Sequence, residues 1–189
     1  MQAVRDLLQE KTFAELSVST ISSRAAVARS GFYFYFDSKY AVLAQILAEA
    51  AEEFEELTQY FAPRQPDESP AQFARRMVGS AAAVYVNNDP VVAACNNARH
   101  TDIEIGDIIE RQFEVVLHQI VGIVEAEIKA GTAHPISDDI PTLVRTLAGT
   151  TALTLTGDAI LVGHDGDVGR RVRVLEQLWL NALWGGSAG

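Results

Sequence analysis

The side chains best suited to chemistry lie between residues 17 and 39, where cations, hydroxyls and aromatic rings occur together. Arg29 can donate to a base edge or a phosphate, Ser30 can do either, and Tyr33 offers a hydroxyl to phosphate. Gly31 keeps the surface between them low, so that a duplex can approach closely. These residue types and their spacing predict contacts to double-stranded DNA.

Two short helices joined by a turn would position these groups. Ser17 or Ser19 can cap the first helix, and the second covers about residues 28–35 with Phe32 and Phe36 facing inward. A helix-turn-helix lays its second helix in the major groove. The predicted DNA-contacting residues are Ser17, Ser19, Thr20, Arg29, Ser30, Gly31, Tyr33, Phe34 and Lys39, the last at the start of a long helix whose N-terminus suits phosphate. From the residues alone, an aromatic helical subdomain without a ligand stays open as the alternative.

No set of residues in the sequence has the spacing of a catalytic or metal site. It contains no HExxH, P-loop or GxGxxG pattern, and its histidines lack zinc-ligand spacing. Cys95 lies in an apolar helical segment, where a buried structural thiol is expected. We therefore predict no catalytic residues, no metal and no cofactor, with a small helical enzyme as the least favoured alternative.

Composition allows a folded chain with a sizeable core. Hydrophobic residues make up 48% of the 189 residues, and the net charge is −10. Residues 1–48 hold five basic and four acidic residues, so the excess acid lies outside the candidate interface. No apolar run reaches the ~18 residues of a membrane span, and the single cysteine fits a reducing compartment. We predict a cytoplasmic protein without a membrane partner.

Helical periodicity dominates the remainder, which predicts an all-α fold of about nine helices. We expect a helix-turn-helix domain at residues 1–45 and an effector-binding and dimerisation domain at residues 46–189, with a proline-containing linker at residues 62–70. The last two helices, from Asp138 or Asp139 to about Val162 and from Val168 to Trp184, are broadly apolar. Such a pair is typical of a two-fold dimer interface, although completing the monomer core is the alternative.

Residues 21–39, and above all FYFYFDSK at residues 32–39, resemble the DNA-binding signature of the TetR family of bacterial transcriptional repressors. Within that family the stretch is most similar to the EthR-like repressors. The resemblance implies a homodimer that binds a palindromic operator and leaves it when a small molecule enters the C-terminal core. Two residues depart from the family pattern. Ala26 stands at the usual turn glycine, and Ala28 at the usual capping serine, a loss of about 1 kcal/mol of local helix stability.

The C-terminal region offers candidates for the effector pocket. A mostly apolar cavity with a few polar groups suits an uncharged lipophilic or aromatic molecule, although a core role is the alternative for each aromatic residue. The candidates are Phe73, Met77, Tyr85, Asn96, Phe113, Leu117, Thr151, Thr154 and Trp179, with Asn97 and Asp158 as further polar anchors. The alternative function is a helical small-molecule-binding dimer with weakened or lost DNA binding, which Ala26 and Ala28 favour.

Overall fold

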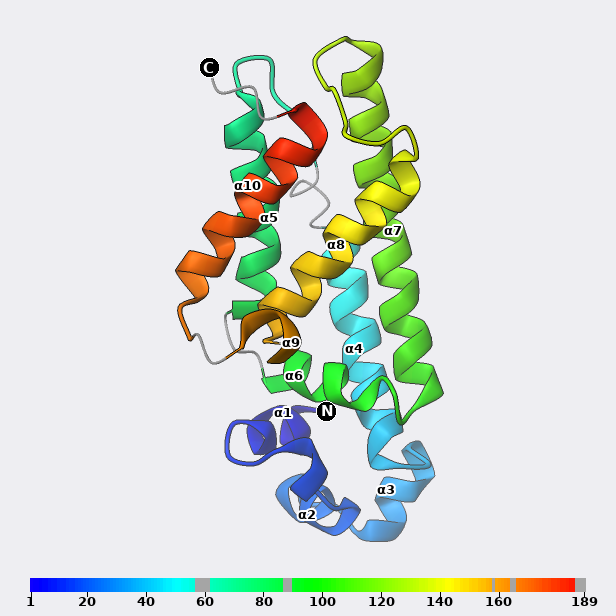
Figure 1. The fold of residues 1–189 in the computed structure, drawn as a ribbon. Helices are drawn as coiled ribbons and strands as arrows, with labels where there is room; N and C mark the ends of the chain where they lie inside the picture. The colour runs from blue at the N-terminus through cyan, green and yellow to red at the C-terminus, as the bar shows by residue number, and fades with distance from the viewer. Residues whose placement is uncertain (57–61, 87–89, 158, 164–165, 186–189) are drawn as a thin grey trace. The chain divides into compact units, whose positions relative to one another are not determined.

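The computed structural model describes residues 1–56, 62–86, 90–157, 159–163 and 166–185, the side chains of residues 50–56, 84–86 and 159 excepted (Figure 1). Within these ranges the chain forms helices and their connections, as the all-α prediction requires. It divides into two compact units, residues 1–57 with 88–113 and residues 58–87 with 114–189. Helix α7 (Ile103–Lys129) carries residues of both units, and the predicted domain boundary after residue 45 falls inside α4 (Lys39–Glu56).

The first unit holds α1 (Gln2–Leu8), the 3-10 helix η1 (Phe13–Glu15), α2 (Val18–Arg24), α3 (Arg29–Tyr35), α4, α6 (Pro90–Ala98) and the start of α7. Helix α6 packs against α1 and α4, while α2 packs against α1 and α3. Apolar residues at helical spacing meet in its centre, among them Val4, Leu7, Ile21, Phe32, Leu43, Ile46 and the thiol of Cys95. The two short helices are thus held on a core that longer helices complete.

The second unit is formed by α5 (Pro70–Val86), the remainder of α7, α8 (Ile140–Thr156), α9 (Ala159–Val162) and α10 (Val168–Trp184). Helix α10 packs against both α5 and α8. The ring of Trp184 meets Phe73 edge-on with centroids 5.7 Å apart. Trp179 Nε1 donates to Thr151 Oγ1 at 2.9 Å, so the buried indole joins α10 to α8.

The end of α8 corrects one expectation. The predicted helix to Val162 is two helices, because Gly157 adopts the left-handed conformation, with φ +82°, and caps α8. The described residues therefore form ten α-helices, where about nine were expected. Asp139 is the N-cap, its side chain accepting from the amide of Thr142 at 3.1 Å. Among the described residues, no helix combines the length and apolar character needed to cross a membrane.

The predicted linker is fastened by charged groups. Arg64 lies 3.0 Å from the Glu127 carboxylate on α7, and its Nη1 donates to the Glu68 carbonyl at 2.6 Å. Arg76 on α5 binds both oxygens of Glu68 at 2.9 Å. Thr132 donates to Glu127 as well. These contacts, most of them partly buried, hold the proline-containing segment against α5 and the end of α7.

Candidate nucleic-acid interface

The N-cap of α2 is Ser17, so the first of the two serines predicted as possible caps takes this role. Ser17 Oγ accepts from the amide of Thr20 at 3.1 Å and shares a hydrogen bond with the Thr20 hydroxyl at 2.8 Å. Ile21 is buried and fixes the inner face of the helix, while Ser17 and Ser19 are exposed. The hydroxyls at the start of α2 therefore face outward, where a phosphate can accept from them.

Helix α3 presents its polar and aromatic residues on the outside. Phe32 is buried, as predicted, and stacks edge-on against Tyr33 at 5.6 Å. Arg29 and Ser30 are exposed, and Arg29 Nη2 donates to the Tyr33 hydroxyl at 3.4 Å. Phe34 is 81% exposed and the neighbouring Tyr35, which the sequence analysis did not select, is 76% exposed. Exposing the apolar surface of two aromatic rings to water is unfavourable, so this surface is suited to binding a partner.

The entry to α3 has a local conformational cost. Ala26 has φ +54°, the left-handed region that glycine occupies with little strain. Ala28 occupies the N-cap with extended backbone and makes no side-chain hydrogen bond to the first turn. At Ala26 the backbone has the conformation that glycine favours, and at Ala28 it has the conformation of an N-cap that a serine side chain would complete.

Lys39 lies differently from the expectation. Its Nζ donates to the carbonyls of Phe13 and Leu16 at 2.8 Å and of Ala14 at 3.3 Å. Burial lowers the pKa of the ammonium from its ordinary value. A phosphate contact from this group would have to displace one of these carbonyls, so the predicted role of Lys39 stays a prediction that the geometry does not favour.

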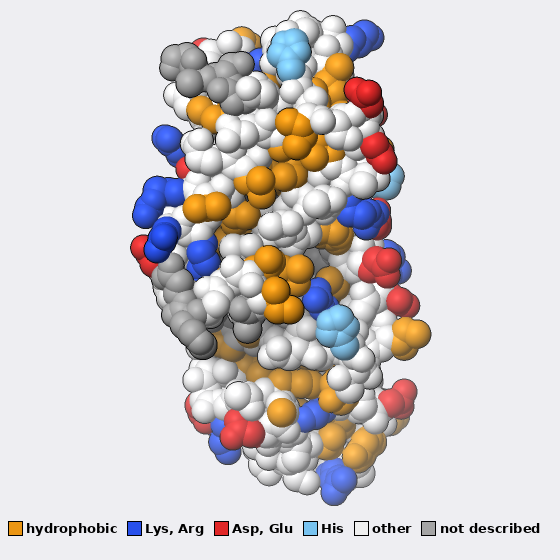
Figure 2. Space-filling view, viewed as in Figure 1, with side chains coloured by type: hydrophobic (Ala, Val, Ile, Leu, Met, Phe, Trp, Pro, Cys, Tyr) orange, Lys and Arg blue, Asp and Glu red, His pale blue; other side chains and the backbone are white. Residues whose placement is uncertain are grey.

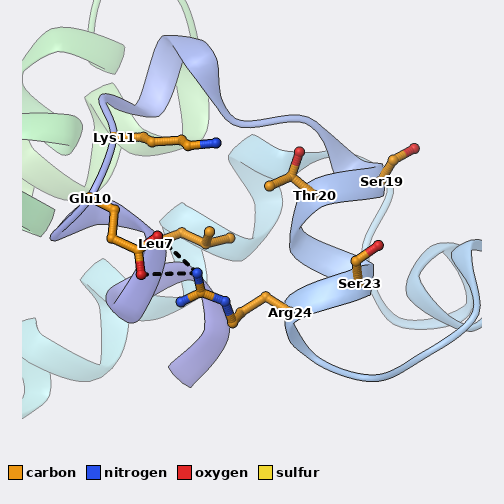
Figure 3. A pocket seen from close by; sticks show the side chains of 7 residues that line it. All are labelled: Leu7, Glu10, Lys11, Ser19, Thr20, Ser23 and Arg24. Atoms are coloured by element: carbon orange, nitrogen blue, oxygen red, sulfur yellow. Dashed lines mark hydrogen bonds and ion pairs between the residues drawn. The ribbon is translucent and has the colours of Figure 1, made fainter.

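A polar hollow of about 620 Å³ lies between α1 and α2 (Figure 3). Arg24 reaches back from α2 to Glu10, with its Nη2 2.9 Å from both carboxylate oxygens. The Arg24 hydrogen bond and charge lower the pKa of the exposed Glu10 carboxyl, and Glu10 in turn raises the pKa of Arg24. The residues that line the hollow are Leu7, Glu10, Lys11, Ser19, Thr20, Ser23 and Arg24.

This hollow adds candidates that the sequence analysis missed. Lys11, Ser23 and Arg24 join the predicted Ser19 and Thr20 around it. Two cations and three hydroxyls are donors that phosphate oxygens accept from. The signal in the sequence was the presence of Lys11 and Arg24 among the few basic residues of the first 48, although their convergence depends on the packing of α1 against α2.

The predicted effector residues are divided between the units. Asn96 and Phe113 belong to the first unit, and the side chain of Tyr85 and all of Asp158 lie outside the described residues. In the second unit Phe73, Met77, Leu117, Thr151, Thr154 and Trp179 are buried. Thr151 is already engaged, since it donates to the Leu147 carbonyl and accepts from Trp179.

The hollows of the structure give no further support to the predicted role of these residues in binding an effector. A second hollow, of about 420 Å³, is lined by residues of the α7 face and by Ala62 and Pro63, and neither hollow includes a predicted effector residue. The effector set therefore stays a prediction. Among the residues that the structure describes, no three histidine, cysteine or carboxylate side chains are grouped as a metal site would require.

Comparison with known proteins assigns the first unit's opening segment. Residues 1–46 match the family model of bacterial regulatory proteins of the tetR family. The chain is 24% identical to the HTH-type transcriptional regulator EthR of Mycobacterium tuberculosis, over 98% of this chain and 85% of that protein.

Solved structures share the fold. A TetR transcription regulator from Haloarcula marismortui superposes with a TM-score of 0.71 at 17% identity, covering 96% of this chain and 94% of that one. The transcriptional regulator FadR from Bacillus subtilis, solved in complex with stearoyl-CoA, gives 0.70 at 17% identity and covers 96% of both chains.

Proposed function

We propose that the chain, a DNA-binding transcriptional regulator of the TetR family, acts as a homodimer on a palindromic operator and is released by a lipophilic or aromatic effector. The observation that carries the DNA-reading part is the outer face of α3. Arg29, Ser30, Tyr33 and Phe34 are exposed together on a short helix whose inner face is fixed by Phe32. An arginine reads guanine edges, and the aromatic rings suit thymine methyl groups and the backbone.

Dimerisation is supported by the outward faces of α8 and α10. Between Thr146 and Thr156 α8 carries no charged residue, and Leu153 is exposed there. On α10, Val174 and Leu178 are exposed one helical turn apart. Figure 2 shows hydrophobic side chains gathered over these two helices. A second copy presenting the same surface would cover them by two-fold symmetry.

Release requires that the effector bind one arrangement of the dimer better than another. Two recognition helices read one face of B-DNA when they are spaced by about 34–36 Å. An effector that favours a different spacing lowers operator affinity. A lipophilic effector fits the aromatic and apolar side chains of the second unit, Phe73, Met77, Leu117 and Trp179. The stearoyl-CoA complex of FadR, which has the same fold, supports a molecule with a long apolar part.

A gel-shift assay with the DNA that flanks the gene tests the DNA-binding proposal. The protein should retard this DNA, and Arg29→Ala and Tyr33→Ala should each weaken binding by about tenfold or more. Arg111→Ala, which removes an exposed arginine from α7, is the matched control and should bind as the unchanged protein does. Failure of the folded protein to retard this DNA at low salt would contradict the proposal.

Sedimentation velocity tests the dimer. Leu178→Glu places a charge on the exposed face of α10 and should give a monomer, whereas Ile136→Glu changes an exposed isoleucine outside α8 and α10 and should leave the dimer intact. Equal sedimentation of both variants as dimers would refute an interface through α10.

A second function is favoured by the entry to α3. The left-handed Ala26 and the uncapped Ala28 weaken the recognition helix, as expected of a small-molecule-binding dimer that has lost its DNA. That function predicts thermal stabilisation by lipophilic ligands without retardation of any flanking DNA. The two assays together therefore separate the two functions.

A further inference from the structure

The side chain of Lys39 is surrounded by main-chain acceptors. A lysine ammonium has three N–H donors, and three carbonyls lie within hydrogen-bonding distance of its Nζ: Phe13 and Leu16 at 2.8 Å and Ala14 at 3.3 Å. The ammonium also lies 4.7 Å from the ring centroid of Phe13 and 5.8 Å from that of Tyr40. Every donor of Lys39 thus has a partner inside the protein.

These carbonyls belong to the connection between α1 and α2. The segment forms the 3-10 helix η1, which is closed at its start by hydrogen bonds from the Thr12 amide and hydroxyl to Glu15. Of the three carbonyls, that of Phe13 also accepts from the amide of Leu16, at 3.2 Å, within the segment. Leu16 directly precedes Ser17, the cap of α2. Lys39 supplies hydrogen bonds to the segment that sets the start of α2.

The position of Lys39 in the chain gives this contact a second consequence. It is the first residue of α4, and α3 ends four residues before it, at Tyr35. The chain already joins α3 to α4, and the ammonium joins α4 to the approach of α2. The edge-on packing of Phe13 against Tyr40, at 5.2 Å, closes the same junction with apolar contact. The positions of both helices of the helix-turn-helix are therefore fixed by contacts with, or direct connection to, the first turn of α4.

We propose that Lys39 is a positioning residue, which fixes the helix-turn-helix to the first turn of α4 through the carbonyls of Phe13, Ala14 and Leu16 and does not itself bind phosphate. A displacement of the start of α4 would then move α2 as well as α3. The inference that this controls DNA affinity rests on the proposed function, whereas the bracing contact does not.

Salt dependence of DNA binding separates positioning from direct contact. Each phosphate neutralised by a side chain contributes about 0.9 to the slope of log affinity against log salt. Lys39→Met should lower the affinity by about tenfold, because hydrogen bonds to a charged group are lost, yet leave the slope unchanged. Arg29→Ala is the control that should reduce the slope by about one if Arg29 binds phosphate. A slope reduced by about one in Lys39→Met would overturn the proposal.

Lys39→Arg distinguishes the two roles a second time and serves if Lys39→Met does not fold. An arginine would satisfy a phosphate at least as well as lysine, but its planar fork cannot direct three N–H groups at these three carbonyls. Positioning therefore predicts weakened binding for Lys39→Arg with the charge retained. Binding equal to that of the unchanged protein would overturn the proposal.

Amide hydrogen exchange tests the brace without DNA. In the Lys39 variants, amides of residues 12–20 should exchange faster, while those of α8 and α10 should be unaffected. Unchanged exchange in residues 12–20 would overturn the brace. If the protein retards no flanking DNA but exchange rises as expected, the proposed function fails while the brace itself is supported.

Discussion

Replacing Ala28 by serine should stabilise α3 by about 1 kcal/mol, because the backbone there already has the form of an N-cap. Ala28 has φ −65° and ψ 150° and offers no side-chain oxygen to the first turn. The cap of α2 shows what serine would add at a similar ψ. Ser17, with φ −113° and ψ 157°, accepts from the amide of Thr20 at 3.1 Å. The new hydroxyl would accept from an amide that α3 leaves open.

Ala26→Gly should add a smaller gain. A left-handed conformation costs an L-residue about 1 kcal/mol or more, but glycine loses more backbone freedom on folding. We expect a net gain of about 0.5 kcal/mol, and about 1.5 kcal/mol for both changes together if the two neighbouring sites act independently.

Urea denaturation followed by circular dichroism measures these differences. In thermal denaturation of a chain of this size, a change of 1 kcal/mol in the free energy of unfolding corresponds to about 2–4 °C in Tm. Ser17→Ala removes a working cap and should lose about 1 kcal/mol, matching the gain from Ala28→Ser. If Ser17→Ala lowers the free energy of unfolding while Ala28→Ser leaves it unchanged, the assignment of Ala28 as a vacant cap is refuted.

Three further changes test other contacts. Glu10→Gln removes the carboxylate that holds Arg24 beside the polar hollow, and should strengthen DNA binding up to about fivefold. Glu104→Gln on α7 changes the charge equally and is the control that should leave DNA binding unchanged. Weaker DNA binding in Glu10→Gln would contradict the hollow as a phosphate site. Burial alone would raise the pKa of the Glu127 carboxyl, but hydrogen bonds from Arg64, Thr132 and Trp184 and the charge of Arg64 lower it overall. The stability it contributes is therefore present above its unfolded pKa of about 4.3 and is lost as the pH falls through the lower folded value. Glu127→Gln should cost about 3 kcal/mol at pH 7 and flatten this acid dependence in urea titrations at several pH values, while Glu114→Gln, from the more exposed pair with Arg145, should cost less than about 1 kcal/mol; equal costs would contradict the importance of burial. Ser22→Ala removes a buried hydroxyl that has no hydrogen-bond partner among the described residues, and should be neutral or stabilise the protein by up to about 1 kcal/mol in the same assay, a clear loss being the result that refutes it.

Residue patterns predicted the inner faces of the helices well, because burial follows helical spacing. The inward Phe32 and the outward Tyr33 and Phe34 lie as predicted. The strained turn and the vacant cap coincide with Ala26 and Ala28, since both depend on local backbone conformation.

Contacts between distant segments could not be predicted from the same patterns. The acceptors of Lys39 are main-chain carbonyls that lie 23 to 26 residues earlier, and carbonyls have no residue signature. The pairing of Glu10 with Arg24, 14 residues apart, depends on how α1 packs on α2. The prediction extended α8 too far, to Val162. A glycine ends a helix only where the backbone adopts the left-handed conformation, as it does at Gly157, and the sequence alone does not show where this happens.

The cysteine and the tryptophans lie in different units, so each type of side chain can report the unfolding of one unit. The chain's only cysteine, Cys95, is buried in the first unit, and both of its tryptophans, Trp179 and Trp184, are buried in the second. Reaction of the thiol with a chromogenic reagent follows the opening of the unit that holds the helix-turn-helix, while indole fluorescence follows the other. One sample of unmodified protein can therefore show whether the two units open together or in succession.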